Sequence, residues 1–184
     1  SISVIIPVFN EEATLLIMLK QFNQLKNNAD FEIIVVNDGS TDNTIKIIEN
    51  NSTLYDKVIH LKNNQGKGKA VIEGLKKSTK DYIFFQDADL EYTPSDILNF
   101  ISIVNDKKAD LILGSRFISN IRPVLYFWHV VGNKLISLMF NILNNTTFSD
   151  IYCCYCLFKR KNLNFKLLKS HNWGQHAEIL TYLS

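Results

Sequence analysis

Apolar runs of strand length alternate with segments of helical period along the first 113 residues, and this alternation restricts the fold more than any other feature. Runs without a polar face are typical of strands covered on both sides, and repeated strand–helix units produce a mostly parallel sheet with right-handed crossovers. We therefore predict a single α/β domain in which helices flank a mostly parallel sheet. The expected strands are 2–8, 31–36, 58–61, 82–85 and 110–113, and the expected helices are 14–25, 41–50, 69–77 and 94–104.

The composition agrees with a compact domain and limits the choice of partners. Of the 184 residues, 46% are hydrophobic and 21% are charged, so the chain can bury a core without disulfides or structural metals. A net charge of +2 gives no reason to expect a nucleic-acid partner. Cys153, Cys154 and Cys156 lack the spacing of a zinc site and are expected to be packing residues in a reducing compartment. The chain has no initiator Met and ends within an expected helix, so we expect residues 1–184 to be one domain of a longer chain, truncated at its C-terminus.

The segment 124–144 differs from the alternating part of the chain. It is apolar and aromatic, but His129, Asn133, Lys134 and Asn141 interrupt it, so it is too polar to span a bilayer and too apolar for an ordinary surface helix. We expect an amphipathic helix that lies on a membrane surface or on another subunit. A helix in the core of this domain is the alternative.

Polar and glycine-rich residues follow every expected strand. In open parallel sheets ligands bind at the carboxyl ends of the strands, so we expect these residues to form one site at one edge of the sheet. In strand order they are Pro7, Phe9, Asn10 and Glu11; Asn37, Asp38, Gly39 and Ser40; residues 64–69; Asp87, Ala88, Asp89 and Glu91; and Gly114, Ser115 and Arg116.

The acidic segment 87–91 is the strongest single indication of chemistry. Asp87, Asp89 and Glu91 leave a buried strand at alternating positions and would repel one another without a cation. Hard oxygen ligands suit Mg²⁺ or Mn²⁺, particularly when a diphosphate completes the coordination shell. The alternative is an acidic turn that caps the helix beginning at Pro94.

The loop 64–69 (NQGKGK) combines a glycine turn with two lysines. Its spacing fits neither the phosphate-loop pattern nor the dinucleotide-binding pattern, and it predicts a weak anion site at a helix start, with a solvated lysine loop as the alternative. Arg116 is a candidate phosphate ligand, and Asp150 and Glu178 are candidate bases. For these three residues a surface position or a helix cap is the alternative.

Taken together, these motifs resemble, in order, the family-2 glycosyltransferases of the GT-A fold, and within them the dolichol-phosphate mannosyltransferase-like branch and its bacterial polyprenyl-phosphate relatives. The resemblance covers essentially the whole chain and implies a Rossmann-like, mostly parallel sheet. The matching segments are 4–12 (VIIPVFNEE), 36–42 (VNDGSTD), 64–70 (NQGKGKA), 87–89 (DAD), 114–117 (GSRF), 126–129 (YFWH), 132–133 (GN) and 149–155 (SDIYCCY).

The resemblance implies a role for each matching residue. Lys69 would lie near the diphosphate, Arg116 would face the phosphates, and Asp150 would lie near the transferred sugar. Contacts with the nucleotide and the donor would come from Pro7, Phe9, Glu11, Asp38, Gly66, Lys69, Asp87 and Ala88. The metal, Mg²⁺ or Mn²⁺, would be held by Asp89 and Glu91. The catalytic set would be Asp87, Asp89, Arg116, Asp150 and Glu178.

The resemblance also implies a reaction, the inverting and metal-dependent transfer of a hexose from a UDP- or GDP-sugar to a polyprenyl (dolichyl or undecaprenyl) phosphate. Such an enzyme would be peripheral on the cytoplasmic face of a membrane. Asn37 stands where the family usually has Asp, and Val130 and Cys156 stand where close bacterial relatives tend to have basic residues. A hydroxyl of a cell-surface glycan is therefore the alternative acceptor, and Asp150 would be the first candidate for its general base.

Two alternative interpretations assign the chain to other functional classes. One is a nucleotidyltransferase, and the other is a catalytically silent nucleotide-sugar-binding module. Nucleotidyltransferases usually present a glycine-rich basic loop after the first strand, where this chain has residues 7–11 (PVFNE). A silent module would be expected to lose its carboxylates, yet Asp87, Asp89 and Glu91 are all present.

Overall fold

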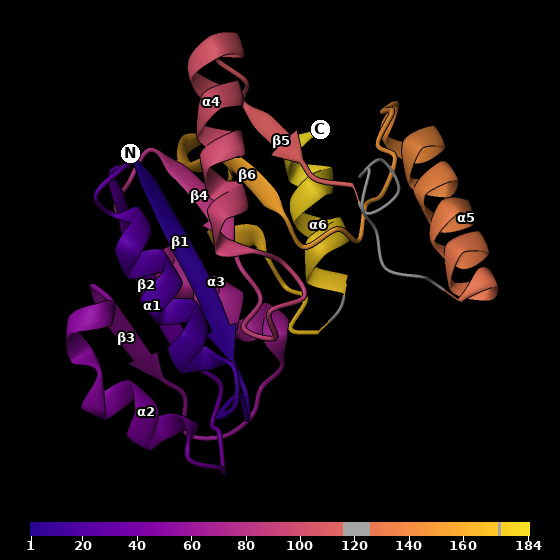
Figure 1. The fold of residues 1–184 in the computed structure, drawn as a ribbon. Coiled ribbons are helices and arrows are strands. Elements are labelled where there is room, and N and C mark those ends of the chain that lie inside the picture. Colours follow the sequence, from indigo (N-terminus) through magenta and orange to yellow (C-terminus); the bar gives the residue numbers. More distant parts are fainter. Residues whose placement is uncertain (116–125, 173) are drawn as a thin grey trace.

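A computed structural model describes residues 1–115, 126–172 and 174–184 and shows a six-stranded sheet with helices on both faces (Figure 1). The strands are β1 (Ile2–Val8), β2 (Phe31–Asn37), β3 (Lys57–His60), β4 (Tyr82–Phe85), β5 (Leu111–Leu113) and β6 (Cys156–Lys159). The helices are α1 (Leu15–Leu25), α2 (Thr44–Asn50), α3 (Lys67–Lys77), α4 (Ile97–Lys107), α5 (Phe127–Asn144) and α6 (Gly174–Leu183). Short 3₁₀ turns are η1 (Ser52–Leu54), η2 (Pro94–Asp96), η3 (Arg160–Asn162) and η4 (Phe165–Leu167). The predicted α/β class is confirmed.

The strand order of the sheet, β3-β2-β1-β4-β6-β5, explains where a ligand can bind. β1 pairs in parallel with β2 and with β4, and β2 pairs in parallel with β3. The chain therefore moves from β1 to one side of the sheet for β2 and β3, and returns to the other side for β4. This reversal leaves a crevice at the carboxyl ends of β1 and β4, which is where open α/β sheets bind their ligands.

The sixth strand was not expected from the sequence. β6 runs antiparallel between β4 and β5 and pairs with both. It therefore separates β5 from β4 and makes the sheet mostly, rather than wholly, parallel. β6 is only four residues long, which is too short for a hydrophobic period to identify it as a strand.

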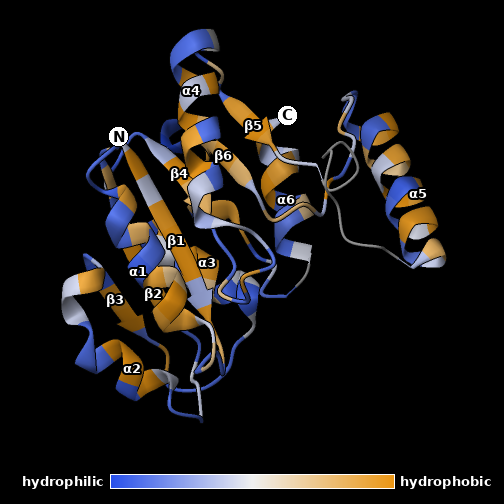
Figure 2. Ribbon diagram, in the orientation of Figure 1, coloured by the Kyte–Doolittle hydropathy of each residue, from blue (hydrophilic) through white to orange (hydrophobic). Residues whose placement is uncertain are grey.

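Two apolar clusters fill the space between the sheet and its helices. Successive side chains of β1 point to opposite faces, so Val4 and Ile6 join one cluster while Ile5 joins the other. The first cluster also contains residues of α1, α2 and α4, and the second contains residues of α3, α5 and α6. Figure 2 shows the same arrangement as hydrophobic strands between amphipathic helices.

Helix starts differ from the predicted ones for local reasons. α2 begins at Thr44 rather than at 41, because the Asp42 carboxylate accepts a hydrogen bond from the Thr44 backbone N–H at 2.9 Å and closes a turn before the helix. Pro94 opens the short turn η2, and α4 follows it. α3 begins at Lys67, two residues earlier than expected.

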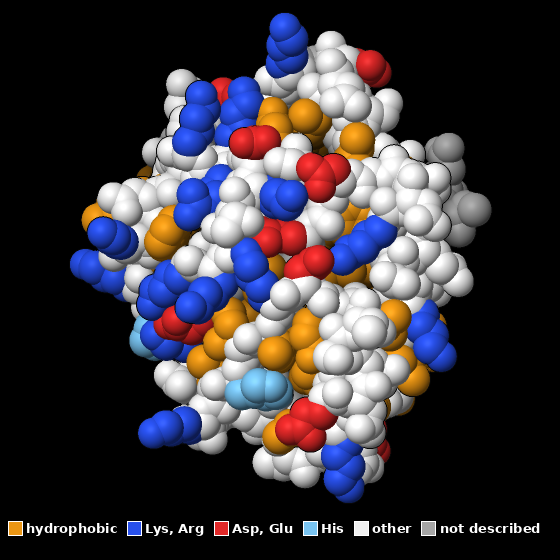
Figure 3. All heavy atoms as spheres, turned by 90° about the vertical axis from the view of Figure 1, so that its left-hand side faces the viewer, with side chains coloured by type: hydrophobic (Ala, Val, Ile, Leu, Met, Phe, Trp, Pro, Cys, Tyr) orange, Lys and Arg blue, Asp and Glu red, His pale blue; other side chains and the backbone are white. Residues whose placement is uncertain are grey.

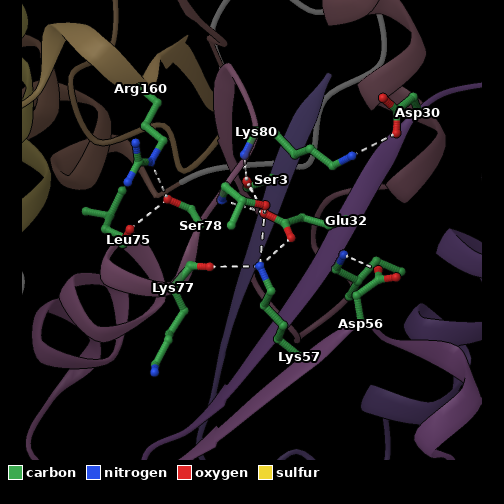
Figure 4. Close-up of polar contacts among 12 residues, drawn as sticks. Ser3, Asp30, Glu32, Asp56, Lys57, Leu75, Lys77, Ser78, Lys80 and Arg160 are labelled. Carbon is green, nitrogen blue, oxygen red and sulfur yellow. Dashed lines mark hydrogen bonds and ion pairs between the residues drawn. The ribbon is translucent and has the colours of Figure 1, made fainter.

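The amino ends of β1 and β2, opposite the crevice, are closed by a buried charge cluster around Glu32 (Figure 4). The Glu32 carboxylate accepts hydrogen bonds from Ser3 Oγ at 2.6 Å, Lys57 Nζ at 2.7 Å and the Thr79 backbone N–H at 2.7 Å. Burial by itself would raise the pKa of Glu32, but these donors more than offset it and lower the pKa to about 2. The cluster ties three strand ends to the turn after α3.

Helix α5 lies to one side of the sheet, beyond α6 (Figure 1). The described part of the expected segment 124–144 is helical from Phe127, and only Ser137 and Phe140 of the helix are buried. Phe140 belongs to the second apolar cluster, and Asn141 Nδ2 donates to the Phe148 carbonyl at 2.8 Å. Among the described residues, no helix combines the length and the apolar character needed to cross a bilayer.

Acidic and basic side chains are mixed over the face of the molecule seen in Figure 3. Several of the lysines have a carboxylate partner, such as Lys26 with Asp56 and Lys80 with Asp30. This mixture agrees with the small net charge of +2.

Candidate functional site

A pocket of about 440 Å³ lies in the crevice at the carboxyl ends of the parallel strands. Its lining comes from the segments after β1, β2 and β4, from the start of α3 and from the loop before α6. The lining residues are Pro7, Val8, Phe9, Glu11, Asp38, Asn64, Gly66, Lys67, Ala70, Asp87, Ala88, Asp89 and Asn172. The structure therefore brings together residues of the segments predicted after the first four strands, whereas Gly114 and Ser115, which follow β5, are absent from the described lining.

The segment after β1 forms one wall of the pocket. Phe9 is 42% exposed, so its ring offers a flat apolar surface at the pocket. The Glu11 carboxylate accepts a hydrogen bond from Thr14 Oγ1 at 2.7 Å, and the Glu11 backbone N–H donates to Thr44 Oγ1 at 2.9 Å. The wall is thus fixed to the starts of α1 and α2 before any ligand arrives.

Asp38, after β2, is only 3% exposed and connects this strand to the glycine loop. Its two carboxylate oxygens accept backbone hydrogen bonds from Gln65 at 2.8 Å and from Gly66 at 2.9 Å. The neighbouring Asn37 accepts from the Ser40 backbone N–H at 3.0 Å, and its amide nitrogen lies 3.2 Å from His60 Nδ1. Asn37 therefore fills buried hydrogen-bonding positions without adding a second buried charge beside Asp38.

Two glycines allow the loop before α6 to pack against the start of α3. Gly66 has φ +93°, and a Cβ there would lie 2.3 Å from Asn172 Oδ1 and 2.6 Å from the His171 carbonyl oxygen. A Cβ on Gly68 would lie 2.6 Å from the Ser170 carbonyl oxygen. Only glycine fits these approaches, and they place Asn172 in the wall of the pocket.

Lys67 and Asp87 form an ion pair inside the pocket, with Nζ 2.5 Å from Oδ1. Lys67 Nζ also donates to Cys154 Sγ at 3.1 Å. Burial lowers the pKa of Lys67, but the Asp87 carboxylate and the hydrogen bonds more than offset this and raise the pKa, so the amine keeps its proton at neutral pH. Burial, followed by the charge of Asp87, raises the pKa of Cys154 to about 12, so this residue is a neutral thiol.

The acidic turn after β4 is stabilised by hydrogen bonds from a buried side chain, Gln86. Gln86 is fully buried, and its Nε2 donates to the Asp87 carbonyl at 3.0 Å and to the Tyr92 carbonyl at 3.3 Å. Asp89 is exposed and accepts the Glu91 backbone N–H at 3.0 Å. The turn thereby presents the side chains of Asp87 and Asp89 to the pocket.

The acidic turn fits a divalent cation in part. Asp87 and Asp89 line the same pocket, whereas Glu91 is exposed and is absent from the described lining. Within the described ranges no three His, Cys, Asp or Glu side chains are grouped closely enough to hold a metal by themselves. Mg²⁺ and Mn²⁺ are commonly bound by one or two carboxylates together with substrate phosphates, and Asp89 with Asp87 nearby fits that kind of site.

The remaining predicted residues lie elsewhere. Lys69 lies outside the described lining and pairs with Glu73 one turn along α3, with Nζ 2.8 Å from Oε1. Asp150 is fully buried beside residues 151–153, where its Oδ1 accepts the Tyr152 backbone N–H at 3.3 Å. Glu178 accepts the backbone N–H groups of residues 169 and 170, so it shapes the loop that reaches Gly68 and does not itself line the pocket. Arg116 lies outside the described residues.

Three polar lining residues were given no individual role from the sequence: Lys67 and Asn64, which were expected at the site only as members of the loop 64–69, and Asn172, which no prediction included. A signal existed for the first, because Lys67 and Lys69 are separated by about 200° around a helix and only one of them can face a given side. Asn172 had no sequence signal, since it reaches the pocket only through the close packing at Gly66.

A second, smaller pocket of about 250 Å³ adjoins the first. The two pockets share Lys67 and Asn172. The remaining lining residues of the second pocket are Asn133, Tyr152, Cys154, Gln175 and His176.

Comparison with known proteins gives three relatives of interest. An uncharacterized protein of Methanocaldococcus jannaschii is 31% identical over 169 residues, which cover 86% of this chain and 72% of the relative. A dolichol-phosphate mannosyltransferase of Pyrococcus furiosus is 33% identical over 118 residues, 64% of this chain and 33% of that protein. An undecaprenyl-phosphate 4-deoxy-4-formamido-L-arabinose transferase of Proteus mirabilis is 28% identical over 186 residues, 97% of this chain and 55% of that protein. The chain thus spans one third to about half of the two relatives with a named activity.

Solved structures agree on the fold. Glucosyl-3-phosphoglycerate synthase of Mycobacterium tuberculosis, crystallised with Mn²⁺, UDP and glucosyl-3-phosphoglycerate, superposes with a TM-score of 0.74 at 20% identity over 98% of this chain and 63% of that one. TarS of S. aureus in complex with UDP-GlcNAc superposes with a TM-score of 0.67 at 20% identity, over 98% of this chain and 54% of that one. These likenesses show the GT-A fold.

The family model described as "Glycosyl transferase family 2" matches residues 3–165. The match runs from the first strand through the glycine loop and the acidic turn to the segment after β6. It therefore covers every strand of the sheet and nearly all of the pocket, and the chain belongs to glycosyl transferase family 2.

Proposed function

We propose that this domain transfers a hexose from a nucleotide diphosphate sugar to an acceptor at a membrane surface, with inversion at the anomeric carbon. The observation that carries the proposal is the composition of the larger pocket. Phe9 and Asp38 lie at the ends of β1 and β2, and Asp87 and Asp89 follow β4 on the other side of β1. This arrangement suits a ligand with a nucleoside at one end and a diphosphate at the other. The UDP and UDP-GlcNAc complexes of the structural neighbours support the same donor class, and the names of two relatives support the transfer of a sugar.

The chemistry requires the bond between the anomeric carbon and a diphosphate oxygen to break. The departing nucleotide gains negative charge, and a protonated Lys67 at the pocket wall stabilises that charge. A divalent cation held by Asp89, with Asp87 nearby and the diphosphate oxygens as further ligands, would supply Lewis-acid stabilisation at the same place. Asp87 has a second role, because its carboxylate keeps the Lys67 amine oriented and charged.

For the acceptor we propose a polyprenyl phosphate, as in the names of two relatives. A phosphate acceptor is already an anion and needs no general base. The exposed apolar side chains of α5, among them Trp128 at 76% and Leu135 at 56% exposure, suit contact with a bilayer surface. Cys153, Cys154 and Cys156 are free thiols, which agrees with a domain on the cytoplasmic side of that membrane.

A glycan hydroxyl is the second candidate acceptor, and a particular observation favours it. Cys156, where close bacterial relatives tend to have a basic residue, is fully buried in β6 and packs in the second apolar cluster. The cation that lines both pockets, Lys67, already faces Asp87. A pocket with so little free positive charge suits a neutral acceptor better than a phosphate dianion.

The test is a transfer assay with the complete protein, using radiolabelled UDP- and GDP-hexoses, Mg²⁺ or Mn²⁺, and either a polyprenyl phosphate or a glycan acceptor. We expect Asp89→Ala to lower kcat/KM by about 100-fold or more, because a ligand of the cation is lost. Asp106→Ala, an exposed carboxylate on α4, is the matched control and should leave the rate unchanged. Full activity in Asp89→Ala, or full activity in the presence of EDTA, would contradict the role of the cation.

A further inference from the structure

The smaller pocket lies directly beyond the ion pair of the larger one. Lys67 and Asn172 form the boundary between the two. The rest of its wall comes from three distant parts of the chain, namely α5 through Asn133, the segment before β6 through Tyr152 and Cys154, and the first turn of α6. A group attached to the outer end of a diphosphate bound near Asp87 and Asp89 would therefore reach this pocket.

The wall of the smaller pocket is polar and almost neutral. Its described lining contains no carboxylate, and its lysine is the one that faces Asp87 at 2.5 Å. The other groups are three side-chain amides, a phenol, an imidazole and a thiol whose pKa is raised to about 12. Amides and a phenol both donate and accept hydrogen bonds, which suits the hydroxyl groups of a sugar.

Gln175 supplies an observation that points to a ligand. Its side chain is only 3% exposed and lines the smaller pocket. Among the residues that the structure describes, its Nε2 atom has no hydrogen-bond partner. Buried side-chain donors are nearly always paired, so a donor left open in the wall of a pocket indicates a missing acceptor.

We propose that the smaller pocket binds the hexose of the donor and that Gln175 selects this sugar by donating a hydrogen bond from Nε2 to one of its hydroxyl oxygens. The proposal rests on the proposed function and names a specificity-determining residue for it. A neutral hydroxylated ring fits the wall, whereas the dianionic phosphate of an acceptor does not. Placement next to Asp87 and Asp89 assigns the ring to the donor, because the sugar is joined to the diphosphate.

The experiment separates nucleotide binding from sugar binding. Isothermal titration of the complete protein with Mn²⁺ compares UDP and GDP with UDP-glucose, UDP-GlcNAc and GDP-mannose. The variant is Gln175→Met, which keeps the size of the side chain and removes the donor. Gln24→Met, at an exposed position on α1, is the matched control. We expect Gln175→Met to bind the free nucleotide as the wild type does, and to lose about tenfold in affinity and in kcat/KM for the preferred nucleotide sugar.

A deoxy donor provides the second measurement. A site built around a hydroxyl group discriminates strongly against the analogue that lacks it. For the hydroxyl that Gln175 binds, the wild type should prefer the parent sugar to the deoxy sugar, and Gln175→Met should lose most of that preference. A loss of affinity for every nucleotide as well would indicate a folding defect, and Gln175→Glu, which keeps the shape and an acceptor oxygen, then serves as the second variant.

Two results would overturn the proposal. One is unchanged affinity and unchanged kcat/KM for all three nucleotide sugars in both Gln175 variants. The other is a change in the KM for the acceptor alone, which would assign the pocket to the acceptor's ring.

If the wild type binds neither UDP nor GDP, the proposed function fails. Gln175 is then tested by NMR titration with free glucose, mannose or N-acetylglucosamine. The side-chain amide resonance of Gln175 is assigned as the one that is missing from the spectrum of Gln175→Met, and binding should shift it. No shift with any of them would overturn the proposal as well.

Discussion

Lys67 and Lys69 are two residues apart at the start of α3, yet only Lys67 lines the pocket. Their side chains leave the helix about 200° apart, so one faces Asp87 while the other pairs with Glu73 along the helix surface. The lysine that a motif comparison selects is Lys69, and the one that packing selects is Lys67. The difference can be measured.

We expect Lys67→Met to lower kcat/KM by about 100-fold, because a charge next to the departing diphosphate is removed and Asp87 loses its partner. Lys69→Met is the matched control and should change kcat/KM by less than about threefold, since Lys69 lies outside the described lining and an ion pair between positions i and i+4 of a helix contributes little. Steady-state kinetics of both variants at saturating metal decides the matter. Equal losses of kcat/KM in the two variants would show that Lys67 has no larger role in catalysis than Lys69.

At the scale of elements, the contact between the glycine turn and the loop before α6 decides the shape of the pocket. The turn has φ +93° at Gly66, and the opposing loop is held by Glu178. Neither segment has a regular secondary structure that would fix it alone. Each depends on the close approach of the other.

Gly66→Ala should therefore weaken nucleotide binding by tenfold or more, because the added Cβ would lie 2.3 Å from Asn172 Oδ1 and 2.6 Å from the His171 carbonyl. Gly132→Ala on α5 is the matched control, since a Cβ there meets nothing within 4 Å. It should raise stability slightly, by about 0.5–1 kcal/mol, as a helical glycine is replaced. Titration calorimetry and thermal unfolding test the two variants, and normal UDP or GDP affinity in Gly66→Ala would contradict the expected displacement.

Helix α5 is the element proposed to contact a membrane. Its exposed apolar side chains include Trp128, Leu135 and Ile142 at 76%, 56% and 72% exposure. We expect the triple substitution of these three residues by Ser to abolish flotation with vesicles of phosphatidylglycerol and phosphatidylethanolamine, because apolar area drives interfacial binding. Ile103→Ser, at an exposed apolar position on α4, should float as the wild type does. Flotation of the triple variant would show that another surface makes the contact.

At the scale of the whole molecule, the two ends of the parallel strands have different tasks. The carboxyl ends of β1, β2 and β4 carry the pocket, whose loops contain exposed polar groups. The amino ends are closed by the cluster around Glu32, in which Lys57, Ser3 and Thr79 satisfy the buried carboxylate (Figure 4). Stability and ligand binding can therefore be altered separately.

The stability of the fold should depend on pH through Glu32. Its folded-state pKa of about 2 lies below the ordinary value of 4.5, so its contribution is complete above pH 4.5 and is lost as the pH falls towards 2. We expect Glu32→Gln to unfold more easily at pH 7 by about 3 kcal/mol, at ~1.4 kcal/mol per pKa unit, and to lose this part of the acid dependence. Urea unfolding between pH 2 and pH 7 measures the free energy of unfolding of the wild type and of Glu32→Gln. Glu49→Gln, on the exposed face of α2, is the control. A parallel acid profile in wild type and Glu32→Gln would refute the assignment.

The amino-acid sequence by itself determined the alternation of strands and helices, the mostly parallel sheet and the edge at which polar groups collect. These features are encoded within short segments, because hydrophobic period and glycine turns act locally, and a parallel sheet brings the ends of its strands together by its topology. The residues that local motifs carry, such as Asp38, Asp87 and Asp89, were accordingly found in the pocket.

Only the tertiary structure decided the place of β6, the choice of Lys67 over Lys69, and the entry of Asn172 and Gln175 into the two pockets. The partners of β6 lie 73 to 77 positions away in sequence in β4 and 43 to 47 positions away in β5. Contacts of this kind depend on how separate segments pack against each other, and no period or spacing within a segment records them. The physical reason is that a side chain's direction is set locally, whereas its partner is set by the meeting of distant parts of the chain.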